Sequence, residues 1–199
     1  MSDAGVAGVS IMSKEADIIY RLNSRDEFIY LNEEWVNFAV ANDASGLLPD
    51  RVLGRLLWDF ITDQTTKQIY REILDQVHAG RPMRFNFRCD APERRRYMEM
   101  TIARCGGGEV QFKVRTVRED GRPRQELLDW HAPRVGELLR ICGWCKRVDI
   151  GEGRWGEVEE AVAAFRLFER LALPMLTHGM CEACFKTMSD KLAERRTRA

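Results

Sequence analysis

The clearest pattern along the chain is an alternation of apolar and polar residues between positions 83 and 114. Apolar side chains fill every second position of three runs, which are Met83, Phe85, Phe87 and Cys89, then Met98, Met100 and Ile102, then Val110, Phe112 and Val114. A period of two predicts β-strands with one buried face and one solvent-facing face. Glycines 106–108 supply a turn between the last two runs. This region is therefore expected to form an antiparallel sheet that is covered on one side.

A shorter set of β-strand and helix patterns precedes this sheet. Residues 18–22 and 28–31 are β-rich apolar runs separated by a polar segment, which predicts a hairpin. Asn32 is expected to cap a helix that starts directly after the hairpin, because two glutamates follow it. Residues 68–79 carry apolar side chains at helical spacing, which predicts a second helix.

A polar stretch, residues 118–125, has no apolar side chain and is the expected domain boundary. Two helical pieces broken at Pro133 are expected after it, and a further amphipathic helix over residues 157–171. The predicted division is an N-terminal tail or cap (1–14), a first domain (15–117), a helical linker (118–141) and a small, mostly helical cysteine module (142–199).

Four of the six cysteines form two Cys-x-x-Cys pairs, which are the strongest chemical signal in the chain. Cys142 and Cys145 follow the end of the expected linker helix, and Cys181 and Cys184 open another helical stretch. A gap of two residues lets both thiolates of a pair reach one ion at about 2.3 Å. A turn followed by a helix start, joined by a long insert, resembles a treble-clef zinc finger. The sequence therefore predicts a zinc ion on these four cysteines.

Four thiolates leave no open coordination position, so this zinc would be structural, contributing on the order of 10 kcal/mol to folding. Iron is the alternative, because rubredoxins also use two such pairs. The glycine that usually follows the second cysteine of each rubredoxin pair is Lys146 or Phe185 here, which favours zinc. Free or disulfide-bonded thiols are a further alternative. His178 is expected beside the ligands rather than among them, with replacement of one cysteine ligand as the alternative.

Composition and charge narrow the class of protein. The chain has 31 basic and 31 acidic residues, so its net charge is zero and nucleic acid is disfavoured as a partner. No apolar run approaches the ~20 residues that cross a bilayer, and the start lacks the layout of a signal peptide. These features predict a cytoplasmic protein without membrane contact. A phosphate-binding glycine loop and a Ser/His/Asp set are both missing from the sequence, so no enzyme activity is expected.

The first domain resembles a PAS sensor domain over residues 15–117. The order of hairpin, helices and three strands matches, and two segments carry the resemblance: residues 29–35 (Ile-Tyr-Leu-Asn-Glu-Glu-Trp) and residues 54–61 (Gly-Arg-Leu-Leu-Trp-Asp-Phe-Ile). The resemblance implies an α+β fold with a curved five-stranded antiparallel sheet and flanking helices. The space between sheet and helices would be a ligand pocket or a solid core, lined by Phe85, Phe87, Met98, Met100, Phe112 and Val114.

The C-terminal part resembles a cysteine module that accompanies sensor domains in bacterial signalling proteins. The resemblance rests on residues 142–147 (Cys-Gly-Trp-Cys-Lys-Arg), on Trp155 and on residues 178–184 (His-Gly-Met-Cys-Glu-Ala-Cys). Together the two parts resemble a bacterial PAS protein with a zinc module fused behind. A haem is disfavoured, because its only candidate ligands are His78, Cys89, Met98 and Met100.

These resemblances imply a non-enzymatic sensory or regulatory protein. Its PAS domain would bind a small ligand or a partner and relay the event through the zinc module to another signalling protein or a second copy of the chain. The linker helices would carry the relay through Leu127, Leu128, Val135, Leu138 and Leu139. Two alternatives remain. One is a zinc-dependent nucleic-acid-binding regulator using the basic C-terminal residues Lys191, Arg195, Arg196 and Arg198. The other is a redox sensor in which cysteine oxidation ejects zinc.

Overall fold

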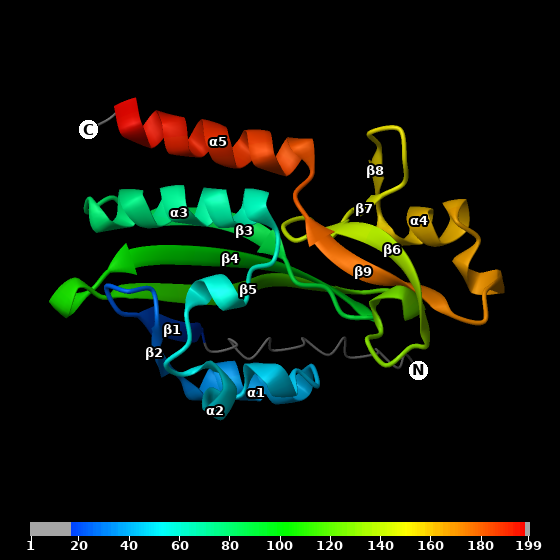
Figure 1. Cartoon of the computed structure of the whole chain (residues 1–199), viewed down its shortest axis with the longest axis horizontal. Helices are drawn as coiled ribbons and strands as arrows, with labels where there is room; N and C mark the ends of the chain where they lie inside the picture. Colours follow the sequence, from blue (N-terminus) through cyan, green and yellow to red (C-terminus); the bar gives the residue numbers. More distant parts are fainter. Residues whose placement is uncertain (1–16, 198–199) are drawn as a thin grey trace, which may run out of the picture.

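A five-stranded antiparallel sheet forms where the alternating pattern predicts it (Figure 1). The strands are β1 (Ile18–Leu22), β2 (Phe28–Leu31), β3 (Met83–Arg88), β4 (Arg94–Arg104) and β5 (Val110–Gly121). They lie side by side in the order β2-β1-β5-β4-β3. This computed structural model describes residues 17–197, so the predicted tail or cap, residues 1–14, lies outside the described residues.

The helices of the first domain lie in the connection between β2 and β3. They are α1 (Glu33–Ala41), α2 (Pro49–Val52) and α3 (Gln64–His78), with 3-10 turns at Ser45–Leu47 and Leu57–Asp59. Asn32 caps α1 as predicted, because its side-chain oxygen accepts a hydrogen bond from the amide of Trp35 at 3.1 Å. Asp63 caps α3 in the same way, so α3 begins four residues before the predicted start at residue 68. The first turn of α3 is wholly polar and lacked the apolar signal used to place its start.

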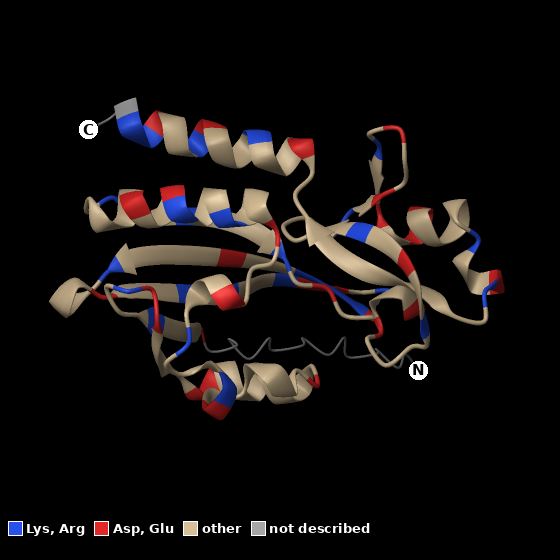
Figure 2. Ribbon diagram, viewed as in Figure 1, with Lys and Arg blue, Asp and Glu red and all other residues tan. Residues whose placement is uncertain are grey.

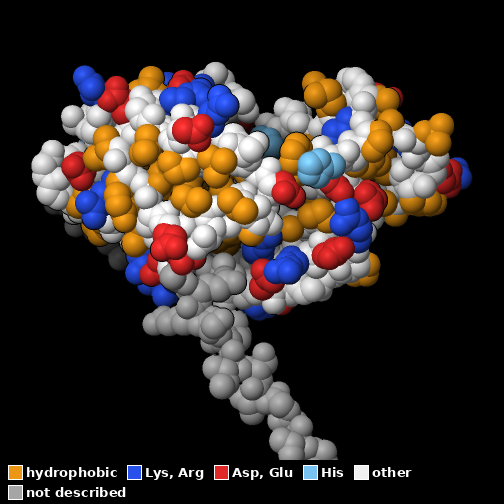
Figure 3. All heavy atoms as spheres, turned by 90° about the horizontal axis from the view of Figure 1, so that it is seen from below, with side chains coloured by type: hydrophobic (Ala, Val, Ile, Leu, Met, Phe, Trp, Pro, Cys, Tyr) orange, Lys and Arg blue, Asp and Glu red, His pale blue; other side chains and the backbone are white. Residues whose placement is uncertain are grey.

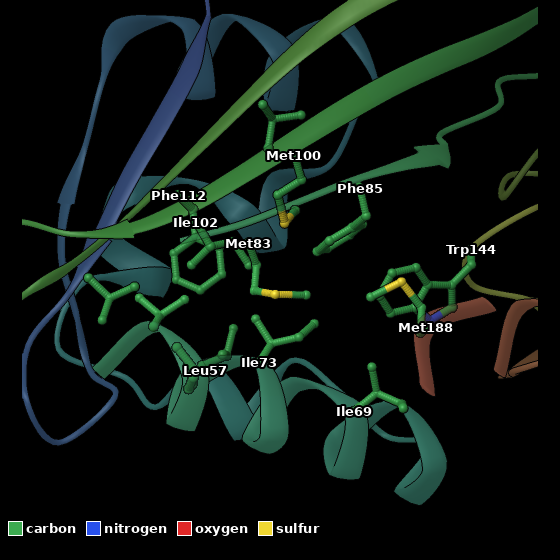
Figure 4. Close-up of a cluster of buried hydrophobic side chains, with 14 of the residues drawn as sticks. Leu57, Ile69, Ile73, Met83, Phe85, Met100, Ile102, Phe112, Trp144 and Met188 are labelled. Atoms are coloured by element: carbon green, nitrogen blue, oxygen red, sulfur yellow. The ribbon is translucent and has the colours of Figure 1, made fainter. Parts of the chain in front are cut away.

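The apolar faces of the strands and of α3 meet in one core (Figure 4). Phe112 and Ile102 are cross-strand partners on β5 and β4, and both are fully buried. Ile69 and Ile73 of α3 pack against the same cluster. The strand order, the helical connection between β2 and β3, and the one-sided covering confirm the predicted PAS-like α+β fold.

A second, four-stranded sheet forms in the C-terminal part. Its strands are β6 (Arg134–Cys142), β7 (Val148–Asp149), β8 (Trp155–Gly156) and β9 (Leu173–Gly179), in the order β8-β7-β6-β9 with β6 and β9 parallel. Two helices accompany it, α4 (Val158–Ala164) and α5 (Glu182–Thr197), with a 3-10 turn at Leu167–Glu169. The sequence analysis predicted the small cysteine module and its C-terminal helix, but not this sheet.

The predicted helical linker over residues 118–141 was wrong. Strand β5 continues to Gly121, a single 3-10 turn spans Glu126–Leu128, and β6 begins at Arg134. Val135, Leu138 and Leu139 mimic helical spacing, but a bulge in β6 between Val135 and Leu138 produces this spacing within a strand. The pairing with β9 overrides the local pattern, because it supplies a full ladder of backbone hydrogen bonds.

One further local expectation needs correction. The helix expected over residues 157–171 ends at Ala164, because Arg166 has left-handed backbone geometry with φ of 51°. In the first domain, the three arginines at 94–96 begin strand β4. Arg96 is buried there and pairs with Glu119 at 3.4 Å.

Helix α5 lies along α3 on the same side of the first sheet (Figure 1). Met188 and Leu192 of α5 are buried in the first domain's core. Charged residues of both signs line the two helices (Figure 2), and Arg196 of α5 pairs with Glu72 of α3 at 2.7 Å. The C-terminal helix is thus fixed to the first domain by apolar and ionic contacts.

The surface beside α1 and α2 carries many apolar side chains between charged ones (Figure 3). Val40 of α1 is 63% exposed and Leu53, just after α2, is 45% exposed. Within residues 17–197, none of the helices combines the length and apolar character needed to span a bilayer.

Candidate metal centre

The first cysteine pair lies in the tight connection between β6 and β7. Cys142 ends β6, and the chain turns back so that the amide of Cys142 donates to the carbonyl of Arg147 at 2.7 Å. Lys146 has a left-handed φ of 61° at the point where the turn closes. We call residues 142–147 the knuckle. Cys142 follows a strand, not the helix end that the sequence analysis expected.

The second pair lies at the start of α5, as predicted. Cys181 directly precedes the helix, its carbonyl accepts from the amide of Phe185 at 2.9 Å, and Cys184 lies in the first turn. The amide of Cys181 points at the sulfur of Cys142, with an N···S distance of 3.4 Å. This amide at the start of α5 therefore faces the sulfur cluster, where it favours negative charge.

The four sulfur atoms of Cys142, Cys145, Cys181 and Cys184 lie within 4.8 Å of one another. The sulfurs of Cys145 and Cys181 are 3.7 Å apart. A tetrahedron with metal–sulfur bonds of about 2.3 Å has edges of about 3.8 Å, whereas a disulfide bond is only about 2.05 Å long. The spacing therefore fits four ligands around one metal ion and excludes a disulfide between these two residues.

The crowding of the four thiols also favours a cation. Hydrogen bonds from the thiols of Cys145 and Cys184 hold the pKa of Cys142 well below its usual range. The same contact with Cys142 raises the pKa of Cys145 to about 12, and the pKa of Cys184 is raised further by both neighbours. Ionisation of the Cys142 thiol thus makes ionisation of the neighbouring thiols less favourable. A bound cation is needed for all four thiols to be ionised together.

One basic residue, Arg147, lies near the sulfur cluster. Arg147 donates to Glu157 at 3.3 Å; this bond, and the nearby sulfurs of Cys145 and Cys181, raise the pKa of Arg147. Lys186, two residues after Cys184, pairs with Asp190 at 2.8 Å on the surface of α5. His178 lies on β9 and is not grouped with the four sulfurs.

Trp144, between the two cysteines of the knuckle, reaches into the core of the first domain (Figure 4). Its ring centroid lies 4.8 Å from that of Phe85 on β3 and 5.8 Å from that of Tyr70 on α3. Its carbonyl accepts a hydrogen bond of 2.7 Å from the amide of Arg88 at the end of β3. The knuckle is therefore a continuation of the first domain's core. The packing of Trp144 in the first domain could not be predicted from the sequence, because an aromatic residue between two ligands is not required for metal binding.

A cluster of ion pairs reinforces this junction. Arg88 bonds to the fully buried Asp90 and to Glu157, the latter at 2.7 Å. Arg122 lies 3.4 Å from the same Asp90, and Arg95 pairs with Glu159 of α4 at 2.8 Å. Burial acts to raise the pKa of Glu157, but the hydrogen bond and the charge of Arg88 outweigh it and lower that pKa. These pairs join the first domain to the start of α4.

A cavity of about 350 Å³ lies between the first sheet, α3 and the knuckle. Of the six predicted pocket residues, Phe85 and Phe87 line it. Met98, Met100 and Phe112 lie in the packed core, and Val114 borders a separate groove beside α1. One wall of this cavity is formed by Gly143, Trp144 and Lys146 of the knuckle together with His178, which no local sequence signal indicated.

No protein-family model matches the chain, and no curated protein matches it. Among solved structures, it is similar to a domain of an HTR-like protein from Haloarcula marismortui ATCC 43049, with 18% identity over 51% of this chain and 98% of that one and a TM-score of 0.34. The photoactive yellow protein domain of the sensor histidine kinase Ppr from Rhodospirillum centenum matches at 16% identity over 50% of this chain and 84% of that one, with a TM-score of 0.35. The PAS domain of Bordetella pertussis BvgS matches at 13% identity over 51% of this chain and 72% of that one, with a TM-score of 0.36. The assignment of a PAS-like fold therefore rests on the strand order of this chain. At these identities and TM-scores, no ligand or activity of the similar structures can be assigned to this chain.

Proposed function

We propose that this chain is a non-enzymatic sensory module in which a structural zinc ion fixes a treble-clef-like knuckle onto a PAS-like domain. The PAS-like domain would respond to a small ligand or partner, and the metal module would pass that response to another signalling protein or to a second copy of the chain. The cytoplasm is the compartment that suits four reduced metal-binding cysteines.

Zinc is the metal that this donor set favours. Four thiolates at tetrahedral spacing fill every coordination position, so the ion would organise the chain without activating water. The knuckle is followed by the short strands β7 and β8 and, after α4 and β9, by helix α5. A knuckle, a hairpin and a helix in this order resemble a treble clef with an insertion before its helix. Cys142 and Cys181 are 0% and 2% exposed, which suits a structural ion held away from solvent.

The observation that carries the proposal is the position of Trp144. The residue is held by metal ligands on both sides, and its side chain packs on Phe85 and Tyr70 of the PAS-like core. A change in the packing of that core, caused by a ligand or partner, would alter the contacts of Trp144 and so the knuckle and α5. The relay is a population shift between two packings, since a ligand moves an equilibrium only by its differential affinity. This relay through Trp144 replaces the relay through linker helices, because those helices do not form.

Metal affinity tests this coupling. Phe85 belongs to the core cluster that includes Cys142 and Cys181, whereas Leu167 belongs to a separate cluster beside α4. We expect Phe85→Leu to weaken zinc binding, measured by competition with a chromophoric chelator, on the order of tenfold. Leu167→Ala is the matched core truncation and should leave zinc affinity within about twofold.

Elemental analysis of the purified chain comes first and should give one zinc per chain. Iron in place of zinc, visible as a red protein, would contradict the choice of metal. Equal zinc affinities for the wild type and Phe85→Leu would contradict the relay. These two failures are separate, because the relay requires a metal but not a particular one.

A further inference from the structure

The cavity beside the knuckle is unusually aromatic. Eight of the chain's eighteen aromatic residues line it: Tyr20, Phe28, Trp35, Phe60, Tyr70, Phe85, Phe87 and Trp144. They come from both sides of the junction, because seven belong to the PAS-like domain and Trp144 belongs to the knuckle. Flat faces on several sides favour a planar aromatic molecule, which gains stacked and edge-to-face contacts with them.

One cation lies on the wall of this cavity. The ammonium of Lys146 donates to the carbonyl of Gly143 at 3.1 Å. Across residues 17–197, no carboxylate lies within ion-pair distance of Lys146. Asp63 also borders the cavity, but its carboxylate is engaged as the cap of α3, accepting from the amide of Thr66 at 2.7 Å. Lys146 thus has a charge and two further N–H donors to offer to a bound molecule.

We infer that the cavity binds a small planar aromatic carboxylate, with its ring among the aromatic side chains and its carboxylate on Lys146. The inference rests on the proposed function and names the ligand class of the sensory site. The metal would be part of this recognition, because Trp144 and Lys146 are held in place by the knuckle. Ligand and metal would therefore bind cooperatively, and the coupling must be reciprocal.

A pair of probes of equal shape tests the charge preference. We expect 2-naphthoate to bind the zinc-loaded chain, and its neutral counterpart 2-naphthamide to bind roughly tenfold more weakly, by isothermal titration calorimetry. Lys146→Met, which keeps the length of the side chain and removes its charge, should abolish this preference, so that the two probes bind with similar affinity. Lys186→Met is the matched control, since Lys186 pairs with Asp190 on the surface of α5 and does not line the cavity.

A second measurement tests the coupling and does not depend on any variant. Bound 2-naphthoate should strengthen zinc binding, measured by competition with a chromophoric chelator, and zinc removal should weaken 2-naphthoate binding by the same factor.

Equal binding of the two probes, or a naphthoate affinity unchanged in Lys146→Met, would overturn the ligand class. An affinity for 2-naphthoate that is unchanged by zinc removal would overturn the proposed cooperativity. A chain that purifies without metal but binds naphthoate would instead contradict the proposed function.

Discussion

The ring centroid of Trp144 lies 4.8 Å from that of Phe85, although Trp144 belongs to the knuckle that carries two of the four clustered cysteines and Phe85 belongs to the sheet of the PAS-like domain. Trp144 is 6% exposed and Phe85 is 2% exposed. A fully buried aromatic contact of this kind couples the two halves of the chain more directly than a linker would. The four-cysteine site is therefore continuous with the PAS-like core.

Removing the Trp144 side chain should destabilise the whole chain without removing the metal. We expect Trp144→Ala to lower the free energy of unfolding by about 3–5 kcal/mol, because it leaves a cavity in a packed core. Zinc content should stay near one per chain, since an alanine between two cysteines is compatible with the turn. Chemical denaturation and elemental analysis measure the two quantities. Trp130→Ala is the control, because Trp130 is 59% exposed and its loss should cost little.

The ion pairs at the junction predict a dependence of stability on pH. The pKa of Glu157 lies below its ordinary value of 4.5 in the folded chain, despite partial burial, because Arg88 stabilises the carboxylate. Its contribution is therefore present above that ordinary value and is lost as the pH falls through the lowered, folded-state pKa. Glu157→Gln should remove about 1–3 kcal/mol at neutral pH.

The same substitution should flatten the loss of stability between neutral pH and about pH 3, measured by urea denaturation. Glu169→Gln is the control, because the pair of Glu169 with Arg166 is exposed. A Glu157→Gln variant whose stability falls with acid as steeply as the wild type would contradict this role.

The structure also bears on the nucleic-acid alternative. Arg195 donates to the carbonyl of Pro82 and Arg196 pairs with Glu72, so these two basic residues hold α5 to the first domain. Arg95 and Arg96 are likewise engaged with Glu159 and Glu119. We expect no steeply salt-dependent binding to a labelled DNA duplex in fluorescence anisotropy. Tight binding that weakens by orders of magnitude as salt rises would revive that alternative.

Much of the first domain could be predicted because its signals are local. The alternation around Phe85 and Phe112 reflects one buried face of a sheet. The helix cap at Asn32 can be predicted from four consecutive residues, 32–35. The two Cys-x-x-Cys spacings predicted the cysteine cluster in the same way. Such signals need no knowledge of distant partners.

The errors arose where distant segments decide the structure. Strand β6 was mistaken for a helix because its partner β9 lies more than thirty residues away in sequence, and Val135 and Leu138 imitate a helical stripe. Four of the six predicted pocket residues do not line the cavity, for a related reason. Met100 and Phe112 alternate like pocket residues, but the cavity is displaced toward the knuckle, where Trp144 and Lys146 form its wall. Nothing in the local sequence indicates that contact.

Hydrogen exchange at the amide of Arg88 tests the central claim most directly, because this amide of β3 donates to the carbonyl of Trp144 in the knuckle. If the metal-bound knuckle is part of the PAS-like core, chelation of the metal should speed amide exchange at Arg88 and along α5. The amides that form the hydrogen bonds between β1 and β5 should stay protected. Unchanged exchange at Arg88 after complete metal removal would contradict the claim.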